Sequence, residues 1–131
     1  MQKAIIIDDE ADSVKLLTLQ LKMYCPQVQV VAGCTDAADG LQQIKTLQPN
    51  IVFLDIEMPV MNGFQLLEKL GAINFSLVFV TAYDQFAVKA FRFSALDYLL
   101  KPIDGKDLQA AVQKAMNRNW PVQQQLTMLK D

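Results

Sequence analysis

Residues 4–10 read Ala4-Ile5-Ile6-Ile7-Asp8-Asp9-Glu10, an apolar run that stops at three consecutive acids. Three successive isoleucines are typical of a strand that is buried on both faces, as in the centre of a parallel sheet. Further short apolar runs follow along the chain, at Val28–Ala32, Ile51–Leu54, Leu77–Val80 and Leu96–Leu100. The spacing between these runs leaves room for a helix after each strand, which predicts strictly alternating strands and helices.

The segments between the runs have helical periodicity. The clearest apolar stripe is in the last segment, formed by Leu108, Ala111, Val112, Ala115 and Met116. Thr35 is expected to mark the start of the second helix, and Asp104 with Asp107 the start of the last one. The alternation predicts an α/β fold, a doubly wound sheet of five parallel strands with helices on both faces. The second run alternates apolar and polar residues, and the fifth contains Asp97, so these two are expected to be the edges.

Composition limits the function classes. The chain has 131 residues, of which 52% are hydrophobic, and this excludes a disordered chain. Twelve basic and 14 acidic residues argue against nucleic-acid binding by this chain alone. The absence of histidine excludes histidine-based triads and zinc–histidine sites. Cys25 and Cys34 are interpreted as buried or half-buried thiols of a reducing cytoplasm, with a disulfide as the lesser alternative. Without a signal peptide or a long apolar stretch, we expect a cytoplasmic protein with no membrane contact.

The helical stripe ends near Met116, and Trp120-Pro121 and Gln123-Gln124-Gln125 follow. We therefore expect one domain over residues 1–118. Residues 119–131 are expected to begin a linker, or a fraying helix, that leads to an output domain absent from this chain.

Acidic residues stand at the ends of two predicted strands, Asp8 and Asp9 after the first and Asp55 after the third. The carboxyl ends of parallel strands share one edge, so these three acids are expected to be neighbours. Two carboxylates ~4 Å apart repel by about 4 kcal/mol at an effective dielectric constant of about 20, so the cluster needs a cation or a shifted pKa. An oxygen-only ligand set favours Mg²⁺.

Two further groups are predicted at the same edge, Thr81 after the fourth strand and Lys101 after the fifth. Singly, each residue has an ordinary structural interpretation as a cap, a turn residue or a solvated charge. Together, a hydroxyl and an ammonium beside a metal-bound carboxylate suit a phosphoryl group. Asp55 would then be the nucleophile that forms an acyl phosphate.

The motifs resemble the receiver domain of two-component response regulators. The matching segments are Ile6–Glu10, Phe53–Pro59, Met61–Gly63, Val80–Tyr83 and Asp97–Pro102. The resemblance extends from Gln2 to Arg118. It implies a flavodoxin-like fold with strand order 2-1-3-4-5 and five helices.

The resemblance implies a set of Mg²⁺ ligands. Asp9, Asp55 and the backbone carbonyl of Glu57 would bind the ion directly, and Asp8 would reach it through water. Because this ion would sit next to the acceptor, the resemblance implies that phosphorylation depends on Mg²⁺.

The resemblance also implies a phosphorylation-activated switch. Asp55 would be the phosphoacceptor, Thr81 and Lys101 would bind the phosphoryl group, and Tyr98 would occupy the aromatic switch position. A cis Lys101–Pro102 peptide bond is expected. Such a chain is not an enzyme in the usual sense, because it catalyses only its own phosphorylation and dephosphorylation.

Partners are implied in the same way. A sensor histidine kinase would donate the phosphoryl group. Homodimers would form through the face made by the helix that holds Phe86 and Phe91, the strand at Leu96–Leu100 and the helix that starts at Asp104. The stretches Thr81–Phe91 and Ala95–Ile103 resemble receivers joined to LytTR-type DNA-binding domains. DNA binding is therefore expected of the full-length protein and not of this chain.

Two alternatives remain at this point. The segment Leu54-Asp55-Ile56-Glu57 loosely resembles the nucleophile motif of Mg²⁺-dependent aspartyl-phosphate hydrolases of the haloacid dehalogenase type, although that motif belongs after the first strand. The chain could also be a receiver-like interaction module that signals without phosphate. The complete set of acids, with Thr81 and Lys101, argues against this module.

Overall fold

The fold is built on one parallel sheet. The computed structural model describes the backbone of residues 1–130 and the side chains of residues 1–117. Its strands are ordered β2-β1-β3-β4-β5, with bounds β1 Gln2–Ile7, β2 Val28–Cys34, β3 Ile51–Leu54, β4 Ser76–Thr81 and β5 Asp97–Leu100. All neighbouring strands pair in parallel. The predicted doubly wound α/β fold, its strand order and its two edge strands are confirmed.

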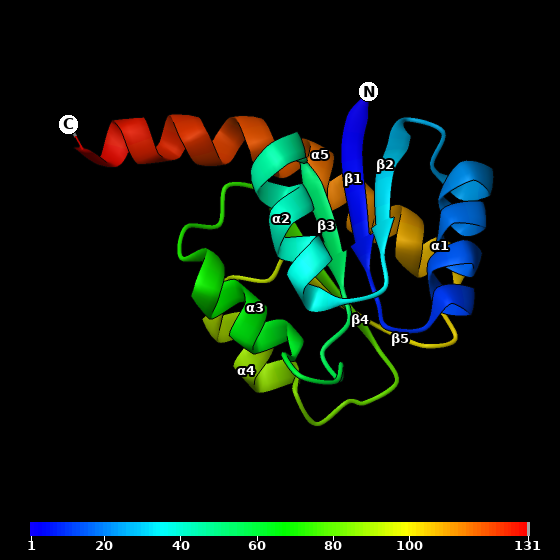
Figure 1. Ribbon diagram of the computed structural model, residues 1–131. Helices are drawn as coiled ribbons and strands as arrows, with labels where there is room; N and C mark the ends of the chain where they lie inside the picture. Colours follow the sequence, from blue (N-terminus) through cyan, green and yellow to red (C-terminus); the bar gives the residue numbers. More distant parts are fainter. Residues whose placement is uncertain (131) are drawn as a thin grey trace.

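Five helices cover the two faces of the sheet (Figure 1). They are α1 Ala11–Tyr24, α2 Ala37–Leu47, α3 Gly63–Leu70, α4 Ala87–Arg92 and α5 Gly105–Lys130. Helices α1 and α5 lie on one face, and α2, α3 and α4 on the other (Figure 1). Among the described residues, no helix combines the length and the apolar character that crossing a membrane requires. The linker expected over residues 119–131 would begin inside α5 and stays a prediction, because its side chains lie outside the described part.

Alternate residues of the central strands enter two separate cores. Ile6 and Phe53 pack in the core below α1 and α5, whereas Ile5, Ile7 and Leu54 pack in the core below α2, α3 and α4. All five side chains are at most 2% exposed. Burying such a side chain contributes about 1.5–3 kcal/mol, so a strand that is apolar at every position is stabilised from both sides. This explains the continuous apolar run at residues 4–7.

The helix starts agree with the sequence in one case and differ in another. Asp104 accepts a hydrogen bond from the Lys106 N–H at 2.7 Å before α5. At α2, however, the cap is Asp36 and not Thr35, because the Asp36 carboxylate accepts the Asp39 N–H at 2.7 Å. Asp36 directly precedes the first helical residue and has an extended backbone, which is the geometry of an N-cap.

The loop between β3 and α3 folds tightly against the end of β3. Asn62 and Gln65 form a reciprocal capping box at the start of α3, and the Gly63 N–H donates to the Ile56 carbonyl at 2.9 Å. A Cβ atom on Gly63 would lie 2.5 Å from the Asp55 carbonyl oxygen. Only glycine therefore lets this loop hold the backbone of Asp55 in place.

We expect Gly63→Ala to destabilise the fold by about 1–3 kcal/mol, because its methyl group meets backbone rather than a movable side chain. The amide NMR signal of Asp55 should also shift. Gly71→Ala is the control, since Gly71 has φ +81° but no atom within 4 Å of the place where a methyl group would lie. It should lower the unfolding temperature through backbone strain and leave the Asp55 signal in place. An unshifted Asp55 signal in Gly63→Ala would contradict this account.

Candidate functional site

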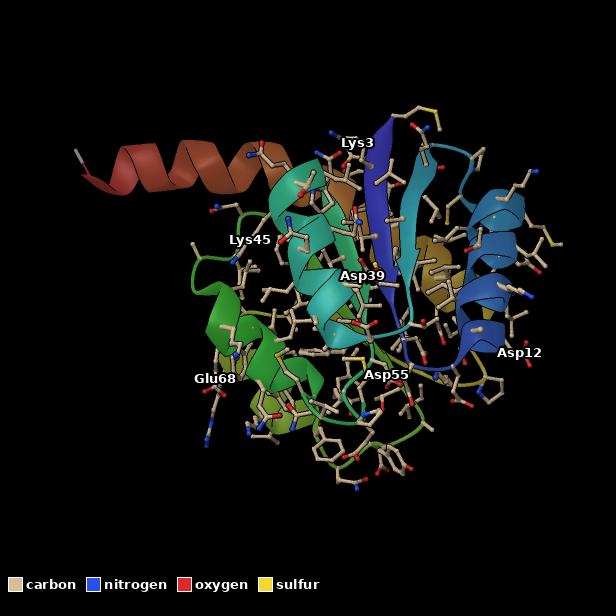
Figure 2. The ribbon with its side chains drawn as sticks, in the orientation of Figure 1. Lys3, Asp12, Asp39, Lys45, Asp55 and Glu68 are labelled. Atoms are coloured by element: carbon tan, nitrogen blue, oxygen red, sulfur yellow. The ribbon has the colours of Figure 1, made fainter. Side chains whose placement is uncertain are left out.

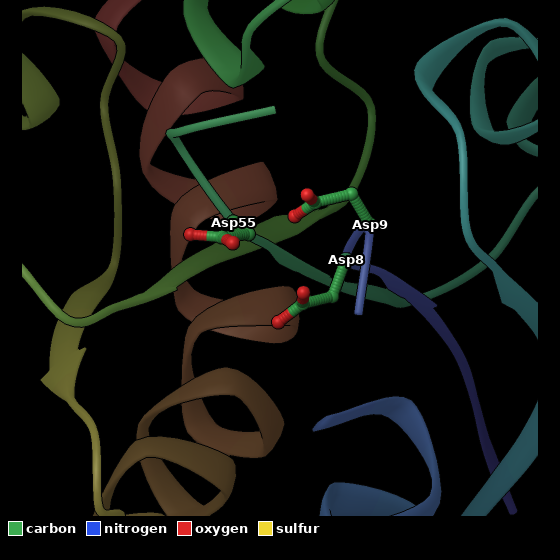
Figure 3. A group of neighbouring side chains, drawn as sticks. All are labelled: Asp8, Asp9 and Asp55. Atoms are coloured by element: carbon green, nitrogen blue, oxygen red, sulfur yellow. The ribbon is translucent and has the colours of Figure 1, made fainter. Parts of the chain in front are cut away.

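The three predicted acids meet at the carboxyl edge of the sheet. Ile7 and Leu54 are register partners on β1 and β3, so the residues that follow them, Asp8 and Asp55, leave adjacent strands at the same level. One carboxylate oxygen from each of Asp8, Asp9 and Asp55 lies within 4.8 Å of the others. Figure 3 shows the three side chains turned toward a common space. The side chains of Figure 2 give the wider view, in which Asp12 and Glu68 project outward while Asp55 lies inside the lower end of the sheet.

Backbone hydrogen bonds fix the positions of two of these acids. The Asp55 N–H donates to the Ile7 carbonyl at 2.9 Å, and the Asp8 N–H donates to the Cys34 carbonyl at 3.0 Å. One oxygen of each carboxylate is held by the following turn. Asp8 Oδ1 accepts the Glu10 N–H at 2.9 Å, and Asp55 Oδ1 accepts the Ile56 N–H at 2.8 Å. The Oδ2 atoms are thereby presented to cationic groups.

Lys101 is the cationic side chain of this cluster. Its Nζ donates to Asp8 Oδ2 at 2.7 Å and lies 3.7 Å from Asp55 Oδ2. Two further contacts come from the start of α1, the Ser13 hydroxyl at 3.3 Å and Glu10 Oε1 at 3.8 Å. Ser13 and Glu10 were not predicted from the sequence as partners of Lys101, because the rotation of α1 about its axis has no signal in residue spacing.

The loop that carries Lys101 is fixed by backbone geometry. The Lys101 N–H donates to the Thr81 carbonyl at 2.8 Å, and the Lys101–Pro102 peptide bond is cis, as expected. The N–H contact joins the ends of β4 and β5, so Lys101 starts from the same edge as the acids.

Burial and charge act in opposite directions on the site. Burial, with the Asp8 charge added, raises the pKa of Asp55 to about 6, although Lys101 opposes this shift. Burial alone would lower the pKa of Lys101, but its hydrogen bond to Asp8 and the charges of Asp55 and Asp8 outweigh burial and raise it. The ammonium therefore stays protonated while one nearby carboxyl is poised close to neutral pH.

The remaining predicted site residues lie around this cluster. Thr81 is fully buried at the end of β4, and its hydroxyl accepts the Tyr83 N–H at 3.3 Å. The half-buried Tyr98 on β5 donates its hydroxyl to the Tyr83 carbonyl. Glu57 is exposed in the loop after Asp55, and its carbonyl as a metal ligand stays a prediction. The structure thus brings four predicted residues into direct proximity and places Thr81 at the same edge.

The donor set fits a magnesium ion. Three carboxylates converge, with ligand atoms within 4.8 Å, and hard oxygen ligands are those that Mg²⁺ prefers. The two cysteines are no part of this set. Both are free and buried, and burial with the charge of Asp39 raises the pKa of Cys34 to about 12. The interpretation as buried thiols is confirmed.

Comparison with known proteins agrees with this geometry. The family model of the response regulator receiver domain matches residues 4–113. An uncharacterized response regulatory protein of Vibrio cholerae is 41% identical over 91% of this chain and 50% of its own length. The transcriptional regulatory protein BtsR of Escherichia coli is 36% identical over 90% of this chain and 48% of its own. The chain therefore spans about half the length of these curated relatives.

A solved structure gives the same result. The REC domain of AraT, a response regulator from Geobacillus stearothermophilus, superposes with a TM-score of 0.80 at 31% identity. The superposition covers 93% of this chain and 98% of that one.

The raised pKa of Asp55 predicts how stability depends on pH. The unfolded chain releases this proton near its ordinary pKa of about 3.9, whereas the folded metal-free protein holds it to about pH 6. The folded state binds the proton more tightly, so the free energy of unfolding falls as pH rises through this window. After allowance for solvent screening we expect a loss on the order of 1–2 kcal/mol.

Urea titrations in a chelator at pH 4.5 and 7.5 measure this loss. Asp55→Asn should remove it, and Asp12→Asn, at an exposed position of α1, should retain it. An equal pH dependence in wild type and Asp55→Asn would contradict the assigned shift.

Proposed function

The chain belongs to the response regulator receiver family, and from this membership we propose that it is a switch that accepts a phosphoryl group on Asp55 in a Mg²⁺-dependent reaction. One observation carries the proposal. The Asp55 carboxylate lies within 4.8 Å of two further acids, and its free oxygen lies 3.7 Å from the Lys101 ammonium. A nucleophile, a cation site and a positive charge thus adjoin one another.

The chemistry assigned to these residues is a single displacement at phosphorus. A carboxylate oxygen of Asp55 would form the new O–P bond, and the bond from phosphorus to the donor would break with its electron pair leaving on the donor. The Lys101 ammonium would offset charge on the phosphoryl oxygens, and the Thr81 hydroxyl would donate to one of them. Mg²⁺ held by Asp8, Asp9 and Asp55, with the Glu57 carbonyl, would supply further positive charge. The chain would act only on itself.

The phosphoryl donor would be a sensor histidine kinase. The chain contains no histidine, so a phosphohistidine must come from a partner. Helix α1 begins two residues after Asp9, and its outer side carries exposed apolar side chains of Leu16, Leu19 and Met23. These residues are three and four apart and share one helical face. They offer such a partner an apolar contact next to the acids.

The output would be transcriptional. BtsR is named a transcriptional regulatory protein, and the segments around Tyr83 and Tyr98 resemble receivers joined to LytTR-type domains. We assign a LytTR-type DNA-binding domain to the part of the full-length protein that this chain lacks. The full-length protein would then bind DNA when Asp55 is phosphorylated.

Activated homodimers would form through α4, β5 and α5. This face exposes Val88, Phe91 and Leu100, which are 72%, 67% and 47% exposed. Charge pairs across the two-fold axis could also form here, but two charged residues of this face, Asp97 and Lys89, have partners within the chain. The Lys114 Nζ donates to Asp97 at 3.2 Å, and the Lys89 Nζ lies 4.7 Å from the centre of the Phe64 ring. Apolar contacts across the two-fold axis therefore support the dimer better than these charges do.

Mass spectrometry tests the phosphoacceptor. With Mg²⁺ and acetyl phosphate, the wild-type chain should gain about 80 Da, one phosphoryl group, and hydroxylamine should remove it. Asp55→Asn should gain nothing, because an amide is a poor nucleophile. Asp9→Ala should lose both Mg²⁺ binding and labelling while remaining folded.

Other outcomes identify the alternatives. Free phosphate without an adduct would indicate a hydrolase, and neither adduct nor phosphate release would indicate an interaction module that works without phosphate. Label that persists in Asp55→Asn would place the acceptor on another residue.

Sedimentation of the chain with Mg²⁺ and beryllofluoride tests the dimer. The wild type should self-associate, and Phe91→Asp should weaken this by about tenfold or more, because it buries a charge in the interface. Leu19→Asp on α1, where Leu19 is 60% exposed, is the matched control and should dimerise like the wild type. Equal weakening in both variants, or no association on activation, would exclude this face.

A further inference from the structure

Helix α1 contacts the segment that carries Lys101 through two polar side chains. The Ser13 hydroxyl accepts from Lys101 Nζ at 3.3 Å, and Gln20 Nε2 donates to the Ile103 carbonyl at 2.9 Å. Ser13 and Gln20 are seven residues apart, two helical turns, and therefore face the same way. One contact holds the backbone of this segment, and the other holds the end of the lysine side chain.

The packing around the Lys101 side chain is incomplete on one side. Its stem borders a groove of about 310 Å³ between α1 and the loop after β5, and the side chain is 21% exposed. The position of the ammonium is therefore set by its hydrogen bonds, of which the structure records two, to Asp8 and to Ser13. The Asp55 oxygen at 3.7 Å is too distant for a third.

The two acceptors differ in what competes for them. Asp8 belongs to the three-acid cluster, so a bound divalent cation would draw on the same carboxylate that holds Lys101. The Ser13 hydroxyl is outside that cluster and carries no charge. A cation bound to the three acids would therefore leave the hydroxyl free to accept from Lys101. Glu10 Oε1 also lies outside the cluster, but at 3.8 Å it is beyond hydrogen-bond distance of the ammonium. Ser13 is thus the hydrogen-bond acceptor that stays with the ammonium when the acids are engaged.

We propose that Ser13 is a positioning residue that holds the Lys101 ammonium beside Asp55, ready to bind a phosphoryl group there. The inference rests on the proposed function and adds to it a residue of α1 that touches neither the acceptor nor the metal cluster. Its role depends on the hydroxyl, so threonine should replace serine and valine should not.

The test compares Ser13→Thr with Ser13→Val, which have the same shape and differ in the hydroxyl. The groove beside Ser13 has room for the added methyl groups. Affinity for beryllofluoride is measured by NMR titration at saturating Mg²⁺. We expect Ser13→Val to bind beryllofluoride about five- to tenfold more weakly than Ser13→Thr, because it loses one hydrogen bond to the ammonium.

Two measurements separate positioning from a general effect on the fold. Mg²⁺ affinity and the unfolding temperature should be the same in the two variants, because the hydroxyl contacts neither the acids nor the core. In the metal-free protein, the protons of the Lys101 ammonium should exchange with water faster in Ser13→Val, as measured by ¹⁵N-resolved NMR. This readout involves no phosphoryl group.

The outcomes are distinct. If the wild type binds no beryllofluoride and accepts no phosphoryl group, the proposed function is wrong and this inference falls with it. If the wild type binds beryllofluoride and Ser13→Val matches Ser13→Thr, the proposed function stands and Ser13 has no positioning role. A parallel loss of Mg²⁺ affinity or stability in Ser13→Val would also overturn the inference, because the effect would then be structural.

Discussion

The ion pair between Lys101 and Asp8 is the contact on which the candidate site depends. It joins the end of β1 to the loop after β5, across the two strands that separate them in the sheet, with Nζ and Oδ2 only 2.7 Å apart. Without a cation, carboxylates packed within 4.8 Å would repel by about 4 kcal/mol for each close pair. Removing one partner of such a poorly solvated pair costs about 3–5 kcal/mol, because it strands the other charge. The sheet topology brings the acids together, and the positive charge of Lys101 reduces the repulsion between them.

This arrangement leaves the negative charge of Asp55 incompletely compensated. One positive charge is shared between two buried acids, and Lys101 is bonded to Asp8 and only faces Asp55. Burial and the neighbouring charge of Asp8 raise the pKa of Asp55 to about 6, and Lys101 offsets this rise only in part. At neutral pH it is mostly ionised, as a nucleophile must be, yet its charge is poorly compensated. A divalent cation would compensate that negative charge. A phosphoryl group on Asp55 would add negative charge at the same place, which is the electrostatic reason why the proposed reaction would depend on the cation.

The features that depend on strand periodicity could be predicted from the sequence. The continuous run before Asp8 identified a central strand, and the topology of a parallel sheet then placed Asp8 and Asp55 together. Details that depend on helix rotation were not predictable. From the sequence alone, Ser13 could have pointed to solvent instead of toward Lys101, since α1 has apolar residues on both its inner and its outer side. The contact of Asp97 with Lys114 was missed for the same reason, and it reduces the part that charge pairing can play in a dimer.

Among the described residues, Tyr83 links Thr81, at the edge where Asp55 lies, to Tyr98 on the proposed dimer face. Its N–H donates to the Thr81 hydroxyl, and its carbonyl accepts the hydroxyl of Tyr98. If a phosphoryl group on Asp55 takes up the Thr81 hydroxyl, that hydroxyl reorients toward it, and the hold on the Tyr83 backbone weakens. The carbonyl that anchors Tyr98 then moves with its own residue. Because the Tyr98 ring lies against Phe79, with centroids 6.3 Å apart, a displaced Tyr98 hydroxyl would change this ring contact as well. A charge added at the buried edge would thereby change the shape of β5, on the face proposed for the dimer.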